Sequence, residues 1–124
     1  MLSQAESRKV AVVDDDHAVR ESLRFLLEIM GYAVETFESA AEFLTADIQQ
    51  MACLILDHHM PHMTGLGLAE RLRGDGICLP ILLITGSPTP DMIVRASQLG
   101  IERVLDKPPS ENELIEFIED SSAR

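Results

Sequence analysis

The chain has 124 residues, the length of one ordinary domain, and its 46% hydrophobic and 25% charged residues exclude a disordered chain. Its 21 acidic residues against 10 basic ones give a formal net charge of −11, which argues against direct contact with DNA or RNA. The longest apolar run, ICLPILLI, is far shorter than the roughly 20 residues of a membrane-spanning helix. The apolar run that follows MLSQAESRK ends at once in DDD and is too short for a signal peptide, so we expect a cytoplasmic protein without a membrane partner.

Short apolar runs predict five strands. They are KVAVV (9–13), AVETF (33–37), ACLIL (52–56), PILLIT (80–85) and RVLD (103–106). Between the strands, apolar residues recur at the spacing of amphipathic helices. These residues are Val19, Leu23, Leu26, Leu27 and Met30; Leu68, Ala69 and Leu72; Met92, Ile93, Ala96 and Leu99; and Leu114, Ile115 and Ile118. The order predicts five βα units.

Capping signals agree with these helices. Asp16 is expected to cap the first helix, and Ser39 with Glu42 and Ser110 with Glu113 have the spacing of capping boxes. The stretch TADIQQMA before the third strand carries no clear stop signal, so the end of the second helix is undefined.

Alternating βα units imply an α/β fold with one doubly wound parallel sheet and helices on both faces. The runs LIL and ILLI suit central strands, which are buried on both sides, whereas AVETF alternates and suits an edge. Functional sites of such sheets lie beyond the carboxyl ends of the strands.

Those carboxyl ends carry a chemically related set of side chains. Asp14 and Asp15 follow the first strand, Asp57 ends the third, Thr85 ends the fourth and Lys107 follows the fifth. Clustered carboxylates suit Mg²⁺, and a carboxylate such as Asp57 can act as a nucleophile toward phosphorus. Lys107 could pair with the carboxylate and then with a phosphoryl oxygen, and Thr85 could donate its hydroxyl to another.

The segments VVDDD, LILDHHMPHMTG, LLITG and VLDKP together resemble the receiver domain of two-component response regulators, from about Lys9 to Asp120. The first third looks most like receivers of the nitrogen-fixation regulator type. The resemblance implies a flavodoxin-like strand order of 2-1-3-4-5 and one receiver domain over residues 1–124. It also implies that a sensor histidine kinase transfers a phosphoryl group to Asp57 in a Mg²⁺-dependent reaction.

The same resemblance assigns roles to individual residues. Asp14, Asp15 and Asp57 match the acidic metal ligands, and the main-chain carbonyl of His59 would complete the protein's share of the Mg²⁺ site. Thr85 matches the hydroxyl switch residue, and Lys107 matches the lysine that precedes a cis proline.

Val104 departs from the family pattern, because many members carry Tyr or Phe three residues before the lysine. Phosphorylation is expected to change the face made by the fourth helix (around 92–99), the strand 103–106 and the fifth helix (around 114–118). A homodimer through this face is a possibility.

The histidines leave several interpretations open. His17, His58, His59 and His62 are expected on loops at the edge that carries Asp57. His59 could reach the phosphoryl group or its attacking water, the four could bind a transition metal, or they could simply be solvated.

Two other functions are considered beside the receiver. A haloacid-dehalogenase-like phosphatase would need an acid where His59 stands, and a pure interaction module would never be phosphorylated. Cys53 and Cys78 lie in apolar stretches without CxxC spacing, and we predict both to be buried, reduced thiols.

Overall fold

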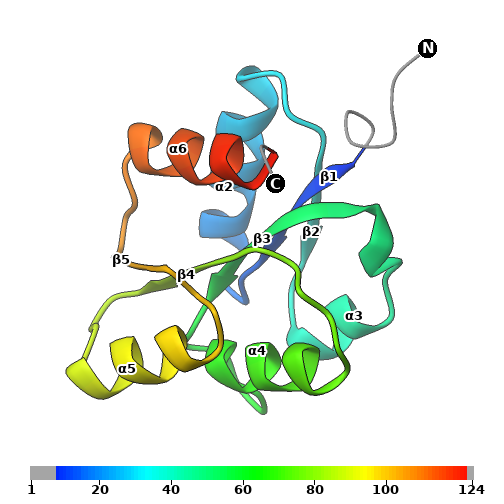
Figure 1. Ribbon diagram of the computed structural model, residues 1–124. Coiled ribbons are helices and arrows are strands. Elements are labelled where there is room, and N and C mark those ends of the chain that lie inside the picture. The colour runs from blue at the N-terminus through cyan, green and yellow to red at the C-terminus, as the bar shows by residue number, and fades with distance from the viewer. Residues whose placement is uncertain (1–7, 123–124) are drawn as a thin grey trace.

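The computed structural model describes residues 8–122, in which strands and helices alternate (Figure 1). The strands are β1 (Lys9–Val13), β2 (Val34–Phe37), β3 (Met51–Asp57), β4 (Ile81–Thr85) and β5 (Arg103–Asp106). The helices are α2 (His17–Ile29), α3 (Ala40–Leu44), the 3₁₀ turn η1 (Ile48–Gln50), α4 (Gly65–Gly74), α5 (Pro90–Gln98) and α6 (Glu111–Ser122). All five predicted strands are present. None of the helices within residues 8–122 is long and apolar enough to cross a membrane.

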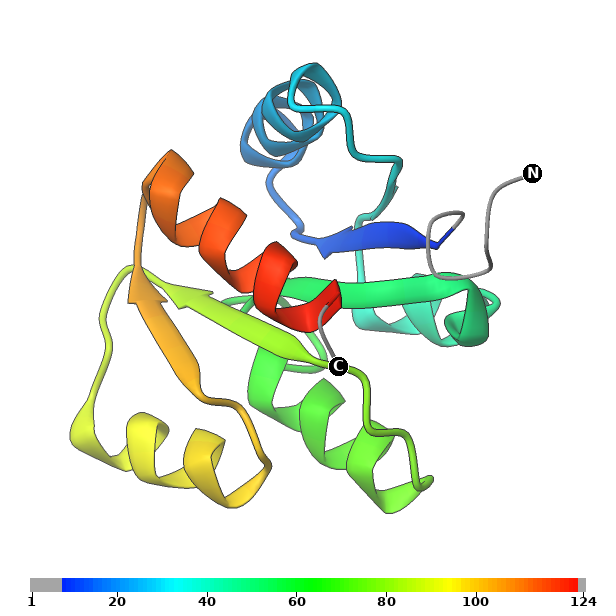
Figure 2. The same ribbon diagram turned by 45° about the horizontal axis from the view of Figure 1, so that its top comes forward.

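The sheet has the order β2-β1-β3-β4-β5, and every neighbouring pair is parallel, which confirms the predicted fold. Figure 2 shows β1, β3, β4 and β5 following one another across the sheet. The register aligns the carboxyl ends, since Val13 pairs with Leu56 and Thr85 pairs with Asp106. Residues that follow β1, β3 and β5 are therefore brought to one edge, although the chain separates them widely.

Helices cover both faces of the sheet, as predicted (Figure 1). On one face, side chains such as Val12, Ile55 and Leu82 form a buried cluster with residues of α2 and α6, including Leu27 and Ile118. On the other face, alternate strand residues pack against α3, α4 and α5; the buried members include Val13, Leu56, Leu83, Phe43, Leu72 and Ala96. Because successive strand residues point to opposite faces, one apolar run supplies both cores.

Side-chain caps define the helix starts. Asp16 and Ser39 accept hydrogen bonds from main-chain N–H groups of the first helical turn, and Ser110 and Glu113 cap one another reciprocally. Helix α3, the second helix of the prediction, is short and ends at Leu44. Thr45 caps this end by donating its hydroxyl to the carbonyl of Glu42 at 2.7 Å. The chain then makes the short turn η1, which explains why no simple stop signal marked the end of α3.

Two positions differ from the predictions. Cys53 is buried, but Cys78 is exposed, because it lies in the loop between α4 and β4 and not in the strand. His17 is the first residue of α2, so it is not a loop residue.

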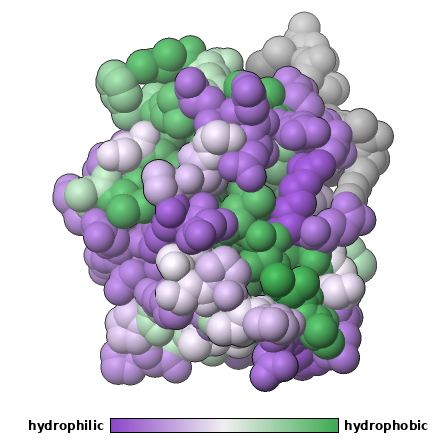
Figure 3. All heavy atoms as spheres, turned by 90° about the vertical axis from the view of Figure 1, so that its left-hand side faces the viewer, coloured by the Kyte–Doolittle hydropathy of each residue, from purple (hydrophilic) through white to green (hydrophobic). Residues whose placement is uncertain are grey.

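Large exposed hydrophobic side chains lie on two helices among the described residues. They are Phe25 and Ile29 on α2, and Ile93 and Val94 on α5. The side of the molecule drawn in Figure 3 shows hydrophobic side chains in separate patches between hydrophilic ones.

Candidate functional site

The loop after β1 holds the first acidic group. Asp14 is 3% exposed, and its Oδ1 accepts a hydrogen bond from the main-chain N–H of Asp16 at 2.8 Å. The buried guanidinium of Arg20 donates from Nη1 to the main-chain carbonyl of Asp14 at 2.7 Å. This contact ties the loop to α2, while Asp15 remains exposed beside it.

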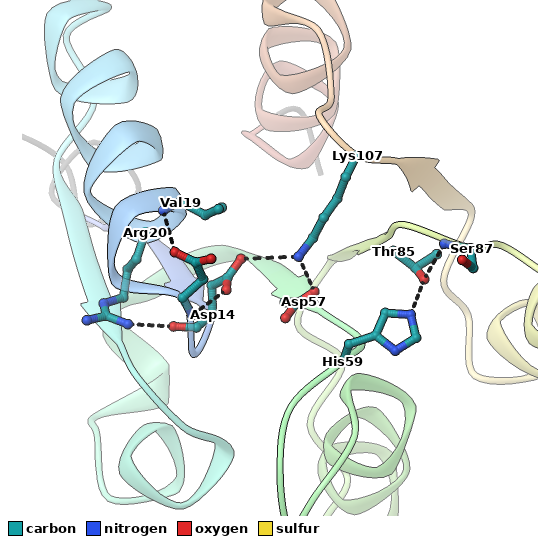
Figure 4. A network of polar contacts seen from close by, with 9 residues as sticks. Asp14, Val19, Arg20, Asp57, His59, Thr85, Ser87 and Lys107 are labelled. Atoms are coloured by element: carbon teal, nitrogen blue, oxygen red, sulfur yellow. Dashed lines mark hydrogen bonds and ion pairs between the residues drawn. The ribbon is translucent and has the colours of Figure 1, made fainter.

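Asp57 is the last residue of β3 and is 2% exposed. The ammonium of Lys107 lies 2.8 Å from Asp57 Oδ1 and 3.8 Å from Asp14 Oδ2 (Figure 4). Apart from this ion pair, the buried Oδ1 has no hydrogen-bond donor among the described residues. An acidic oxygen in this state is suited to a cation.

Asp14, Asp15 and Asp57 could hold a metal ion together. Each offers a carboxylate oxygen, and these oxygens lie within 4.8 Å of one another. Carboxylate oxygens are hard ligands, and the exposed position of Asp15 leaves access for water, as hydrated divalent cations require. The buried Oδ1 of Asp57, which is balanced by the Lys107 ammonium, supports the same fit.

Thr85 ends β4 and is fully buried, but its hydroxyl is engaged elsewhere. Oγ1 accepts a hydrogen bond from the main-chain N–H of Ser87 at 3.2 Å and lies 2.8 Å from Nε2 of His59. In Figure 4 the ring of His59 and the side chain of Thr85 point toward one another. The structure thus gives the His59 side chain a contact that the sequence did not predict.

Burial and neighbouring charges shift two pKa values at the site. Burial raises the pKa of the Asp14 carboxyl, and the negative charge of Asp57 adds to this shift. For Lys107, burial alone would lower the pKa, but contact with Asp57 and the nearby Asp14 outweigh it, so its pKa is raised. The ammonium is therefore charged at neutral pH, and the buried acid resists ionisation unless a cation balances it.

The loop after β3 brings the start of α4 close to the end of the strand. The carbonyl of His58 accepts hydrogen bonds from Met60 N and Gly65 N, at 3.1 and 3.0 Å. A Cβ at Gly65 would lie 2.7 Å from the carbonyl oxygen of Asp57 and 2.9 Å from Cα of His58. Glycine is thus required where α4 begins against the strand end, and a positive φ is not the reason.

Sequence reasoning missed some supporting residues. Arg20 was not singled out, since an arginine within an amphipathic helix is normally exposed. Two other histidines are also engaged: Nδ1 of His17 lies 3.1 Å from Nη2 of Arg20, and Nδ1 of His58 accepts a hydrogen bond from Leu66 N at 3.4 Å. Burial lowers the pKa of His58. The Lys107–Pro108 peptide bond is cis, as the resemblance implied.

Comparison with known proteins agrees with this arrangement. Residues 10–119 match the model of the response regulator receiver domain. The chain is 39% identical over 120 residues to the transcriptional regulatory protein FixJ of Azorhizobium caulinodans, which covers 96% of this chain and 57% of that protein. It is 40% identical over 108 residues to the response regulator protein TodT of Pseudomonas putida, covering 86% of this chain and 47% of TodT.

A solved structure is similar to this chain over its whole length. The crystal structure of FixJ-N superimposes with a TM-score of 0.85 at 34% identity, covering 100% of this chain and 97% of that one. The chain spans about half the length of the curated relatives that it matches. Sequence, fold and the juxtaposition of acids and lysine agree, and the chain belongs to the receiver domain family of two-component response regulators.

Proposed function

We propose that residues 1–124 form one cytoplasmic receiver domain that accepts a phosphoryl group on Asp57 from a sensor histidine kinase. The observation that carries this proposal is the buried carboxylate at the end of β3, with an ammonium at 2.8 Å and two further acids alongside. Membership of the family supports the same role.

The chemistry assigns a task to each side chain. An oxygen of Asp57 attacks phosphorus, and the P–N bond of the donor phosphohistidine breaks, leaving its electron pair on the imidazole, which takes a proton. Lys107 already lies against the attacking carboxylate, and its ammonium is placed to follow the charge onto a phosphoryl oxygen. Thr85 donates its hydroxyl to another phosphoryl oxygen.

Mg²⁺ would be held by Asp14, Asp15 and Asp57, together with the main-chain carbonyl of His59. When bound, the metal supplies positive charge that offsets the charge on the transferring group. The residues themselves fix the acids beforehand, because Asp14 is anchored through its carbonyl to Arg20 and through its carboxylate to Asp16.

The module is a phosphoacceptor and not a turnover enzyme, apart from self-phosphorylation by small donors and slow loss of its own phosphate. Its output is a change of partner surface across α5, β5 and α6, where Ile93 and Val94 are exposed and a homodimer could form. Val104, which is half-buried on β5, stands where many family members carry Tyr or Phe, so a smaller side chain takes the place of the usual aromatic relay residue. We assign no nucleic-acid contact to residues 1–124, whose formal net charge is −11.

Incubation with acetyl phosphate and Mg²⁺, followed by intact-mass measurement, tests the proposal. One phosphoryl group should be added to the wild type and none to Asp57→Asn, which keeps the side-chain shape and removes the nucleophile. Sustained hydrolysis of the donor would instead indicate a phosphatase, and no reaction would indicate a pure interaction module. Mass is the practical readout, because the chain contains no tryptophan to report binding by fluorescence.

A further inference from the structure

The hydroxyl of Thr85 is held away from the acidic cluster. Its two hydrogen-bonding contacts among the described residues are to Ser87 N at 3.2 Å and to His59 Nε2 at 2.8 Å. Figure 4 shows these three residues grouped to one side, with Asp57 and Lys107 paired separately. The hydroxyl is therefore occupied by a side chain, the ring of His59, to which the proposed phosphoryl chemistry assigns no part.

The contact fixes the hydroxyl whichever ring nitrogen carries the proton. A threonine oxygen has one hydrogen to donate and two lone pairs. The N–H of Ser87 occupies one lone pair, and His59 takes either the hydrogen or the second lone pair. Where Nε2 accepts, it takes the only hydrogen of the hydroxyl; where Nε2–H donates, that hydrogen is left over, but the oxygen is held on the His59 side. In either tautomer, moving Oγ1 toward a group on Asp57 breaks the contact with Nε2.

We propose that His59 is a latch, a positioning residue that acts through Thr85 and opposes the phosphorylated state. The inference rests on the proposed function and deepens it. In the unphosphorylated protein the ring holds the Thr85 hydroxyl. Acceptance of a phosphoryl group requires the two to part, so the bond reduces the affinity of the site for that group.

Thr85 and His59 differ in how well water can replace their hydrogen bond. Thr85 is fully buried and gains a partner there, whereas the exposed ring of His59 can exchange the bond for water on release. The ring is also placed by His58, whose centroid lies 5.2 Å away with the two planes at 74°. A net hydrogen bond of ordinary strength corresponds to about a fivefold change in affinity.

The experiment measures the binding of beryllium trifluoride, a phosphoryl analogue, by NMR titration. Each variant is titrated at a Mg²⁺ concentration that saturates that variant, which is determined beforehand. His59→Ala should bind about fivefold more tightly than the wild type. His59→Phe should do the same, since it keeps a ring but removes Nε2. The matched control is His62→Asn, which removes an exposed imidazole from the same loop and tolerates its φ of 71°. It should bind like the wild type.

A double-mutant cycle with Thr85→Val shows whether the effect passes through the hydroxyl. In the Thr85→Val background, His59→Ala should change the affinity by less than about twofold, because the bond is already absent. Urea unfolding of the same four proteins without the analogue should show a favourable coupling between the two residues in the unphosphorylated state.

Each other result has a definite meaning. Equal affinity of His59→Ala and the wild type overturns the latch, as does wild-type behaviour of His59→Phe. The same gain in the Thr85→Val background also overturns it, because His59 would then act on the phosphoryl group directly. Failure of the wild type to bind the analogue at all overturns the proposed function, and the latch with it.

Discussion

Replacing Asp14 by asparagine should stabilise the metal-free fold while weakening the metal site. The carboxylate is 3% exposed, and its pKa is raised chiefly by burial, so the ionised form is disfavoured in the folded protein. Asparagine has nearly the same shape, and its side-chain oxygen can still accept the hydrogen bond from Asp16 N that Asp14 Oδ1 accepts at 2.8 Å. The substitution therefore removes the charge and keeps the hydrogen bond from Asp16 N.

The geometry indicates how large the effect should be. With an effective dielectric constant of about 20, repulsion between carboxylate oxygens no more than 4.8 Å apart is at least about 3.5 kcal/mol. Attraction of Asp14 to Lys107 at 3.8 Å is about 4 kcal/mol on the same scale. The repulsion from buried Asp57 nearly cancels the attraction to Lys107, and the exposed Asp15 is largely screened by water, so the cost of burying the charge decides the sign. We expect Asp14→Asn to raise the free energy of unfolding by about 1 to 2 kcal/mol at pH 7.

Urea denaturation followed by far-ultraviolet circular dichroism measures this difference. Mg²⁺ at one hundred times its dissociation constant should add about 2.7 kcal/mol to the wild type and much less to Asp14→Asn, so the order of stability should reverse. The pH dependence has a definite sign. Because the folded pKa of Asp14 lies above its unfolded value, its cost is present at neutral pH and disappears as pH falls through the folded pKa. The two metal-free proteins should therefore converge in stability on acidification.

A lower stability of Asp14→Asn in metal-free buffer at pH 7 would refute this reasoning. It would mean that attraction to Lys107 outweighs the burial of the charge. A stability difference that stays constant between neutral and acidic pH would also contradict it, because the titration of Asp14 would then play no part.

Two further predictions concern packing and thiol exposure. Gly65→Ala should lower the free energy of unfolding by about 2 to 3 kcal/mol in urea denaturation, since the new methyl group would meet the backbone of Asp57. Gly74→Ala, at the open end of the same helix, should raise it by about 0.5 to 1 kcal/mol, and similar losses in both would contradict the close-approach argument. With a thiol reagent at pH 8, the native protein should expose Cys78 alone, because burial raises the pKa of Cys53 to about 12. Two fast-reacting thiols before urea is added would show that the core around Cys53 opens.

Most of the fold could be predicted, because the sheet imposes a simple burial pattern on the sequence. The apolar runs of β3 and β4 are covered on both faces, and β2, whose run alternates, lies at the edge. The end of α3 could not be predicted in this way. It depends on the Thr45 hydroxyl and a 3₁₀ turn, which have no single-residue signature as strong as glycine.

The site divides along a similar line. The meeting of Asp14, Asp57 and Lys107 follows from strand order, because the carboxyl ends of parallel strands share one edge. The contact between His59 and Thr85 depends on the path of a loop and on one side-chain rotamer, which no periodic pattern encodes. Arg20 is a related case. Its partner is the main-chain carbonyl of Asp14, and a main-chain partner leaves no signal in the sequence.

Different side chains set the charge of this site and the orientation of the Thr85 hydroxyl. Three acids face one ammonium, so the cluster carries an excess of negative charge that a divalent cation would neutralise. The orientation of Thr85 depends instead on His59 and Ser87, and neither contact involves a carboxylate. The acids of the metal site therefore use neither the Thr85 hydroxyl nor the imidazole ring of His59. Under the proposed function, a phosphoryl group on Asp57 would compete for that hydroxyl directly, and its arrival would couple the acidic cluster to β4.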